Sequence, residues 1–280
     1  FALGGFFMDN LFKKGLNWKK VYEIFQTDFK LFVFIIGLFF FFSIAFIAVM
    51  GVYLGVNTST QDIMTALYYG FKISLKSAGI LASASFIICV ITNFFIPLYY
   101  QKVRMTISSA YVLVLTILFY ARIPYYQQFH ASFNQLIFNT FNDDVSALTS
   151  SIFQEYNLPL RFGIAFITAF ILIKNLKWWL NTKVIYLPTF SKNYNNIAIR
   201  VLFLLVVYNA VIFIRFGGSM SFAYNVDWEN SGVTKDQLLN EAILDDVQAL
   251  YRAYELNGRL LSSVGMGLDV QQVISYAKSL

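Results

Sequence analysis

The segment Leu31–Leu54, LFVFIIGLFFFFSIAFIAVMGVYL, contains no charged side chain. A helix needs about 20 predominantly apolar residues to cross the hydrocarbon core of a bilayer, so this segment is long enough to span a membrane. It is too long for the apolar core of a secretory signal peptide, and no convincing small-residue cleavage pattern follows it. The sequence therefore predicts a transmembrane helix that is retained in the protein.

Four other apolar runs follow the first one along the chain. They are Ile80–Leu98, Met105–Ala121, Leu160–Ile173 and Ile197–Ile214. The third of these four is the weakest, because it reaches spanning length only if the helix continues towards Leu180. Hydrophobic residues make up 58% of the chain and charged residues 13%, about half the share of a typical soluble domain. The predicted fold is all-α: a polytopic membrane protein with about five transmembrane helices.

Two regions outside the predicted spans have amphipathic patterns. The loop Arg122–Pro159 spaces its apolar side chains as helices that lie along a membrane surface do. Beyond Arg215 the chain becomes acidic, and apolar side chains recur at steps of four and three. This spacing predicts one extracellular helix of about six turns, starting near a capping pattern at Thr234 and Gln237. Its apolar face consists of Leu239, Ile243, Val247, Leu250 and Tyr254.

The basic side chains are unevenly distributed among the loops, and positive loops stay on the cytoplasmic side of a membrane. Three loops on one side hold Lys13, Lys14, Lys19, Lys20, Lys30, Lys102, Arg104, Lys174, Lys177, Lys183, Lys192 and Arg200. The opposite loops hold Lys72, Lys76, Arg122 and Arg161. We therefore expect a cytoplasmic amino-terminal segment (1–30), a five-span domain (31–215) in the plasma or inner membrane, and an extracytoplasmic connector (216–280). We attribute the net charge of +6 to the basic cytoplasmic loops of this topology and not to nucleic-acid binding.

Residues suited to catalysis are few in this sequence. His130 is the only histidine, and no nucleophile-elbow or phosphate-loop motif is present. We interpret His130 as a polar residue of an interfacial helix and the single Cys89 as a small apolar packing residue. The adjacent carboxylates Asp143–Asp144 and Asp245–Asp246 are interpreted as solvated helix faces, because neighbouring residues of a helix do not face each other. The sequence predicts no catalytic residue and no metal ligand.

Basic side chains near the predicted outer ends of the spans form a candidate site for a lipid headgroup. Its residues are Lys72, Lys76, Arg122, Asn134, Arg161 and Arg215, and Tyr125, Tyr126, Asn139 and Asp143 could complete it. An arginine fork matches phosphate oxygens, so the expected partner is an anionic phospholipid. The alternative is that these are ordinary snorkelling and anchoring residues.

Three stretches occur in an order that matches a known family. They are Ala66–Ala78 (ALYYGFKISLKSA), Tyr125–Asn139 (YYQQFHASFNQLIFN) followed by Asp143–Asp144 and Tyr156–Pro159, and Gln237–Tyr254 (QLLNEAILDDVQALYRAY). With the five spans, they make the chain resemble the membrane half of the lipoteichoic acid synthase and phosphoglycerol transferase family. The resemblance covers most of Leu31–Tyr254.

The resemblance implies a bacterial envelope enzyme whose catalytic domain is extracellular, sulfatase-like and related to alkaline phosphatase. In the family, that domain uses a threonine or serine nucleophile and a divalent metal to transfer phosphoglycerol or phosphoethanolamine from a lipid. None of its motifs lies in these 280 residues, so the catalytic domain and its metal are expected outside them, and enzyme activity of this segment is left open. The implied role is to hold that domain and to bind lipid substrate.

Two other functions remain open from the sequence. The first is a polytopic transporter or channel subunit, although charges near the span edges and the lack of matched halves argue against it. The second is a non-catalytic membrane scaffold that docks a partner on its carboxyl-terminal helix.

Overall fold

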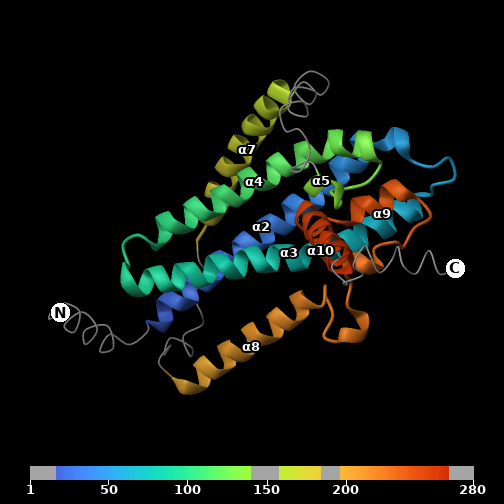
Figure 1. The fold of residues 1–280 in the computed structure, drawn as a ribbon. Helices are drawn as coiled ribbons and strands as arrows, with labels where there is room; N and C mark the ends of the chain where they lie inside the picture. Colours follow the sequence, from blue (N-terminus) through green and yellow to red (C-terminus); the bar gives the residue numbers. More distant parts are fainter. Residues whose placement is uncertain (1–16, 140–157, 184–195, 265–280) are drawn as a thin grey trace, which may run out of the picture.

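The computed structural model describes residues 17–139, 158–183 and 196–264, and every regular element within these ranges is a helix. Five helices are long and apolar enough to cross a membrane (Figure 1). They are α2 (Trp18–Val49), α3 (Thr60–Phe95), α4 (Tyr100–Phe129), α7 (Leu158–Leu180) and α8 (Ile197–Arg215). The predicted all-helical, five-span fold is confirmed. The weakest predicted span corresponds to α7, which is longer than its apolar run at both ends.

Shorter elements connect these helices and follow the last one. They are η1 (Gly51–Tyr53), α5 (Leu136–Asn139), η3 (Phe222–Tyr224), η4 (Trp228–Asn230), α9 (Gln237–Ile243) and α10 (Asp246–Val264). The surface loop is predicted to begin at Arg122, but α4 continues through Pro124 to Phe129, so the first part of that loop belongs to α4. The residues 140–157, which include Asp143–Asp144, lie outside the described part of the chain.

Three helices are longer than a bilayer requires. With 32, 36 and 30 residues, α2, α3 and α4 measure about 48, 54 and 45 Å at a rise of about 1.5 Å per residue. The hydrocarbon core of a bilayer is about 30 Å thick, so these helices extend beyond it. The polar residues at their ends therefore lie near the membrane surfaces, where other parts of the chain can contact them.

The core of the protein is formed where α2 packs against α3, α4 and α7. One face of α2 is buried at helical spacing, through Leu31, Ile35, Phe39, Phe42 and Phe46. The Phe42 ring stacks on Phe119 of α4, with 4.4 Å between the centroids. Figure 1 shows α7 on the side of α4 and α8 on the opposite side, next to α3. Large apolar side chains on the outer faces are exposed, as lipid-facing surfaces require.

The helix α8 is attached to the rest of the protein at few points, and none of its residues is buried. It lies close to α3 at Gly79, where an added Cβ atom would lie 2.2 Å from Cγ2 of Ile214. The side chain of Phe203 also packs edge-on against Phe25 of α2, with 5.2 Å between the ring centroids. Most of the remaining surface of α8 consists of exposed apolar side chains.

Charged residues are not confined to the helix ends, contrary to the sequence argument. The helix α2 begins at Trp18, where Asn17 accepts a hydrogen bond from the Lys20 amide, so Asp28 lies inside the helix and is buried. The Asp28 carboxylate accepts hydrogen bonds from Ser85 at 2.8 Å and from Arg104 at 3.0 and 3.2 Å. This pair links α2, α3 and α4 near the start of α2.

Candidate functional site

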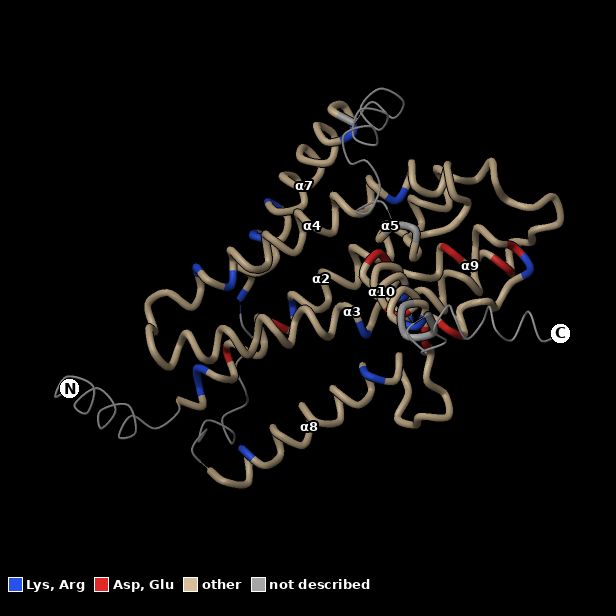
Figure 2. The backbone as a smooth tube through the Cα atoms, in the orientation of Figure 1, with Lys and Arg blue, Asp and Glu red and all other residues tan. Residues whose placement is uncertain are grey.

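The connector docks against one end of the helix bundle, and we call this region the junction. In it, α9 packs on α2 and α3, and α10 packs on α3 and α4. Figure 2 shows acidic and basic residues gathered around α9 and α10. The junction consists of Lys76, Ser77, Arg122, Ser132, Asp227, Glu241, Asp245, Asp246, Gln248 and Arg252.

The connector begins with a tight turn at the end of α8. The amide of Gly218 donates to the carbonyl of Phe213, and Gly217 and Gly218 have φ angles of 62° and 84°. Glycine adopts this left-handed conformation without a steric penalty. An added Cβ atom at Gly217 would lie 3.0 Å from the carbonyl oxygen of Lys72, so the turn rests directly on α3.

Asp236 fixes the start of α9 to the turn between α2 and α3. Its side chain accepts hydrogen bonds from the amides of Leu239 (3.2 Å) and Gly55 (2.8 Å) and from the hydroxyl of Thr58. Burial opposes ionisation, but these hydrogen bonds outweigh it and lower the pKa of Asp236. The predicted capping box at Thr234 is wrong, because Thr234 binds Asn240 and Asp236 is the capping residue.

The predicted single carboxyl-terminal helix is two helices, which is a correction. Leu244 is extended, and the Asp245 side chain accepts from the amides of Val247 (3.0 Å) and Gln248 (2.9 Å) to start α10. An aspartate that binds these free amides stabilises a new helix start, and the break changes which face of α10 meets the bundle. Tyr254 is accordingly 64% exposed.

The side chains of α10 that face the bundle differ from the predicted apolar face. Ala249 and Ala253 are buried, whereas Val247 and Leu250 are half-buried. The predicted face is correct in α9, where Leu239 and Ile243 are fully buried. The helix also continues past the predicted stop at Asn257–Gly258 to Val264.

Arg122 is the central side chain of the junction. Its Nη1 donates to Oδ1 of Asp246 at 3.3 Å, and its Nη2 donates to the Glu241 carbonyl at 2.5 Å. The guanidinium lies over the Phe46 ring, 4.1 Å from the centroid. Both Arg122 and Asp246 are only 2% exposed. One arginine of α4 therefore binds both helices of the connector.

Asp245 and Asp246 are buried in the junction, so their interpretation as a solvated helix face is wrong. Burial raises the pKa of Asp246 to about 6, although Arg122 lowers it; the neighbouring Asp245 adds to the rise. Burial also raises the pKa of Asp245, against hydrogen bonds from Gln248, Ser77 and Val247. The hydroxyl of Ser77 in α3 donates to the Asp245 carboxylate at 2.9 Å and accepts from the side-chain amide of Gln248 at 3.2 Å.

Two further ion pairs surround this centre. Arg252 of α10 binds Glu241 of α9 through both terminal nitrogens, at 2.7 and 3.1 Å, and the Ser132 amide donates to the same carboxylate at 2.8 Å. Burial opposes ionisation of Glu241, but Arg252 and Ser132 together lower its pKa. Lys76 of α3 donates to Asp227 at 2.7 Å. The connector is therefore held by charge-assisted hydrogen bonds on each side of Arg122.

The predicted lipid-headgroup residues divide between two environments. Lys76 and Arg122 are buried and bind connector carboxylates, so in this arrangement they hold protein rather than phosphate. Lys72 lies beside the rings of Tyr68 and Tyr69, and Arg215 is exposed at the end of α8.

The other members of that predicted site are buried, half-buried or outside the described part of the chain. Asn134 accepts a hydrogen bond from the hydroxyl of Tyr125 at 2.6 Å, and Arg161 is half-buried near the start of α7. Tyr126 packs edge-on against Phe46. The side chain of Asn139 and all of Asp143 lie outside the described part. Binding of lipid by these residues stays a prediction.

The acidic half of the junction is absent from the predicted site. That prediction includes Arg122 and Lys76 but pairs them with a lipid, whereas Asp246 and Asp227 of the connector are their partners. A signal was present, since the connector holds Asp227, Glu229, Asp236, Glu241, Asp245, Asp246, Glu255 and Asp269, more than half of the 15 acidic residues. An acidic segment next to basic span ends indicates electrostatic docking.

Comparison with known protein families, with curated proteins and with solved structures finds no match for this chain. Within the described ranges, no three His, Cys, Asp or Glu side chains are placed to hold a metal ion. The fold therefore defines the class on its own: a multi-pass, all-helical membrane protein whose carboxyl-terminal connector is docked on the bundle.

Proposed function

We propose that the chain is the membrane-anchoring module of an envelope enzyme similar to lipoteichoic acid synthases and phosphoglycerol transferases. The connector is the mount of an extracellular catalytic domain. The observation that carries the proposal is the docking of the connector through Arg122 and Asp246. Buried ion pairs fix the orientation of the connector relative to the helix bundle, as the attachment of a catalytic domain requires. A flexible linker, in contrast, is solvated throughout.

The apolar packing of the connector supports the same role. Leu238, Leu239, Ile243 and Leu244 are fully buried in the core shared with α2 and α3. Burying a leucine or isoleucine side chain contributes about 1.5–3 kcal/mol, so four such residues stabilise the docked state by several kcal/mol. The distribution of Lys and Arg among the loops supports an orientation with the junction outside the cell.

Lipid substrate would reach such a domain at the edge of the junction. Lys72 and Arg215 lie there and form no ion pair with any residue that the structure describes. They are the members of the predicted headgroup site that the connector leaves available to an anionic phosphate. Arg215 offers a bidentate fork, and Lys72 a point charge.

The experiment is a transfer assay on the protein expressed from its whole gene and reconstituted in liposomes. Fluorescent phosphatidylglycerol or phosphatidylethanolamine is the donor, Mn²⁺ or Mg²⁺ is added, and diacylglycerol is measured. We expect diacylglycerol release that needs the metal and that falls when Arg215 is replaced by Ala. The control is Arg259→Ala, which removes an exposed pair with Glu229. Metal-independent or absent release with both donors would refute the proposal.

A transporter or channel subunit is the second candidate, and one observation favours it. Asp28 and Arg104 form a buried ion pair within helices long enough to span a membrane, and such residues often mark transport pathways. They are bonded to each other and to Ser85, which equally suits a structural role. Flux of ions or solutes across the same liposomes, abolished by Asp28→Asn, would favour this candidate over the enzyme module.

A further inference from the structure

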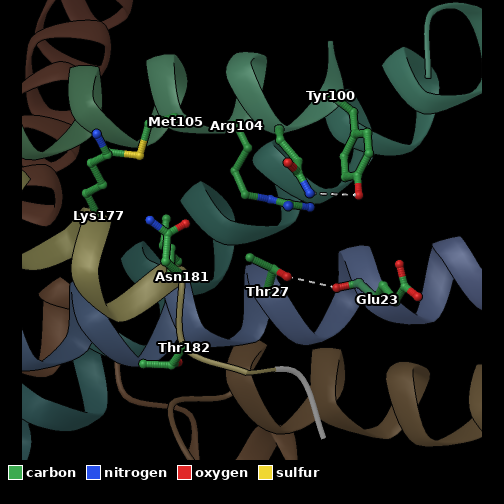
Figure 3. Close-up of a pocket in the computed structure, with 10 residues that line it drawn as sticks. Glu23, Thr27, Tyr100, Arg104, Met105, Lys177, Asn181 and Thr182 are labelled. Carbon is green, nitrogen blue, oxygen red and sulfur yellow. Dashed lines mark hydrogen bonds between the residues drawn. The ribbon is translucent and has the colours of Figure 1, made fainter. Parts of the chain in front are cut away.

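A pocket of about 290 Å³ lies between α2, α4 and α7 (Figure 3). It is far from the junction, because Arg104 in the pocket and Arg122 in the junction are separated by five turns of α4, about 27 Å. Its polar wall includes Tyr100, Gln101 and Arg104 of α4. The opposite side is formed by Lys177 and by the residues that end and follow α7.

The charges around the pocket leave an excess of positive charge. Glu23 is the only carboxylate that lines it, and Lys20 binds Glu23 at 2.7 Å. Arg104 is paired with Asp28 behind the wall. Lys177 forms no ion pair with the described residues, and Lys30 donates to Thr182 at the edge of the pocket, at 2.7 and 2.9 Å.

The hydrogen-bond donors of the pocket are only partly used. Arg104 is 4% exposed, and its Nε and Nη2 bind Asp28 and the carbonyl of Ile24. The side-chain amide of Gln101 donates to the Tyr100 hydroxyl at 3.2 Å, which leaves a second amide proton. Tyr99 provides no side-chain cap for α4, and Tyr100 and Gln101 of its first turn line the pocket, so the positive end of that helix lies next to it.

The depth of the pocket matches the headgroup layer of a membrane. Trp178 is exposed beside it, and the indole of Trp179 donates to the Lys30 carbonyl at 2.9 Å. Tryptophan is enriched where the hydrocarbon core meets water, which is also where lipid phosphates lie. Met105 and Leu180 supply an apolar part of the wall.

We propose that this pocket binds the phosphate group of an anionic phospholipid. Arg104 and Lys177 supply charge, and Gln101 donates a hydrogen bond. The volume is at the lower limit for ligand pockets, so it admits a headgroup while the acyl chains stay in the bilayer. The inference does not rest on the proposed function, since it uses neither the junction nor a catalytic domain.

The experiment measures lipid retention on the purified chain by native mass spectrometry. Nanodiscs contain phosphatidylcholine with a minor fraction of phosphatidylglycerol. The test variant combines Lys177→Ala with Gln101→Ala, which leaves the Asp28–Arg104 pair intact. The matched control is Lys174→Ala, because Lys174 is an exposed lysine of the same helix that lies over the Phe170 ring and does not line the pocket. Circular dichroism and thermal melting establish that each variant is folded.

We expect wild type and Lys174→Ala to retain phosphatidylglycerol in preference to phosphatidylcholine. The double variant should bind it about tenfold more weakly, the effect of losing one charge-assisted hydrogen bond. Equal loss in the control, or equal retention of the two lipids by wild type, would overturn the proposal. Glycerol phosphate is the second probe: weak competition is expected, and binding as tight as that of the lipid would assign the pocket to a soluble phosphate ester and overturn the lipid assignment.

Discussion

Arg122 determines how the connector is attached, because one side chain contacts two helices. Its guanidinium binds a carbonyl of α9 and a carboxylate of α10 while it covers the ring of Phe46. A lysine offers a single ammonium group and could not reproduce this planar arrangement. A buried ion pair adds little to the free energy of unfolding compared with apolar residues of similar size. Removal of one partner is nevertheless costly, because the other charge then lies buried without a partner. Arg122 therefore contributes specificity of docking more than net stability.

Replacement of Arg122 by Ala should destabilise the protein in a pH-dependent way. At pH 8 we expect a loss of about 3–5 kcal/mol, because ionised Asp246 then lies buried without its partner. At pH 5 the loss should be smaller, since the pKa of Asp246 is already about 6 and rises further without Arg122. Thermal unfolding in detergent at several pH values measures this difference.

The control for this prediction is Arg259→Ala. Arg259 and Glu229 are both more than half exposed, so their pair should contribute little to stability at any pH. A loss for Arg122→Ala that is equal at pH 5 and pH 8 would contradict the role assigned to Asp246.

The wild-type junction should itself respond to pH in two directions. The pKa values of Asp245 and Asp246 are raised, so the stability linked to their protonation is present at low pH and is lost as pH rises through about 6 for Asp246. The pKa values of Asp236 and Glu241 are lowered, so their contribution is present above their ordinary pKa near 4 and is lost as pH falls below it. We expect maximal resistance of the connector to proteolysis between these limits, near pH 5. A steady gain of resistance from pH 5 to pH 8 would disagree.

At the scale of the elements, the break between α9 and α10 depends on Asp245. Asp245→Ala should cost about 1–3 kcal/mol, because it removes the cap of α10 and leaves Ser77 and Gln248 without their acceptor. Asp245→Asn should be tolerated better, since an amide oxygen can still accept both helix amides and carries no charge to bury. Hydrogen exchange at Val247 and Gln248 compares the two variants. Equal protection in both would show that the cap does not hold the helix start.

The contact between α3 and α8 provides a second test of an element. A leucine at position 79 would collide with Ile214, so Gly79→Leu should destabilise the protein by about 1–3 kcal/mol. Gly163→Leu on α7 is the matched control, because nothing lies within 4 Å of a Cβ atom there. Melting temperatures of the two variants in the same detergent give the comparison. If the additional substitution Ile214→Ala restores the melting temperature of Gly79→Leu, the strain lies at this contact.

Hydropathy identified the existence of each long helix but not its ends. The run at Ile80 covers only the second half of α3, because the first half contains Lys72, Lys76 and four serines or threonines that lower its hydropathy. Of these residues, Lys76 and Ser77 bind carboxylates of the connector, so their polar groups are satisfied although they are buried. The break at Asp245 was missed for a related reason: a spacing of four and three continues across it, and only the cap hydrogen bonds distinguish two helices from one.

For the whole molecule, the sequence predicted the class of fold better than the site. Apolar runs of spanning length depend on local composition, which the sequence contains directly. The partner of Arg122 is 124 positions away, so composition could indicate an acidic connector but not that Asp246 is the residue in contact. The pocket beside Arg104 likewise requires three helices to be placed together.

The orientation of the whole molecule can be tested by cysteine labelling. Tyr254→Cys and Lys183→Cys both replace exposed residues, and the natural Cys89 is buried, so background labelling should be low. From the distribution of Lys and Arg, we expect a membrane-impermeant maleimide to label position 254 in intact cells and position 183 only after permeabilisation. The reverse pattern would overturn the orientation.

The order in which the ribosome makes these residues gives the junction a further meaning. Arg122 enters the membrane with α4, whereas Asp246 is synthesised only after α7 and α8. Until Asp246 is made, the Arg122 guanidinium lacks the carboxylate with which it pairs in the folded protein. The pair can therefore form only after α7 and α8 have been made, so the docking of the connector is a late step in the assembly of the bundle.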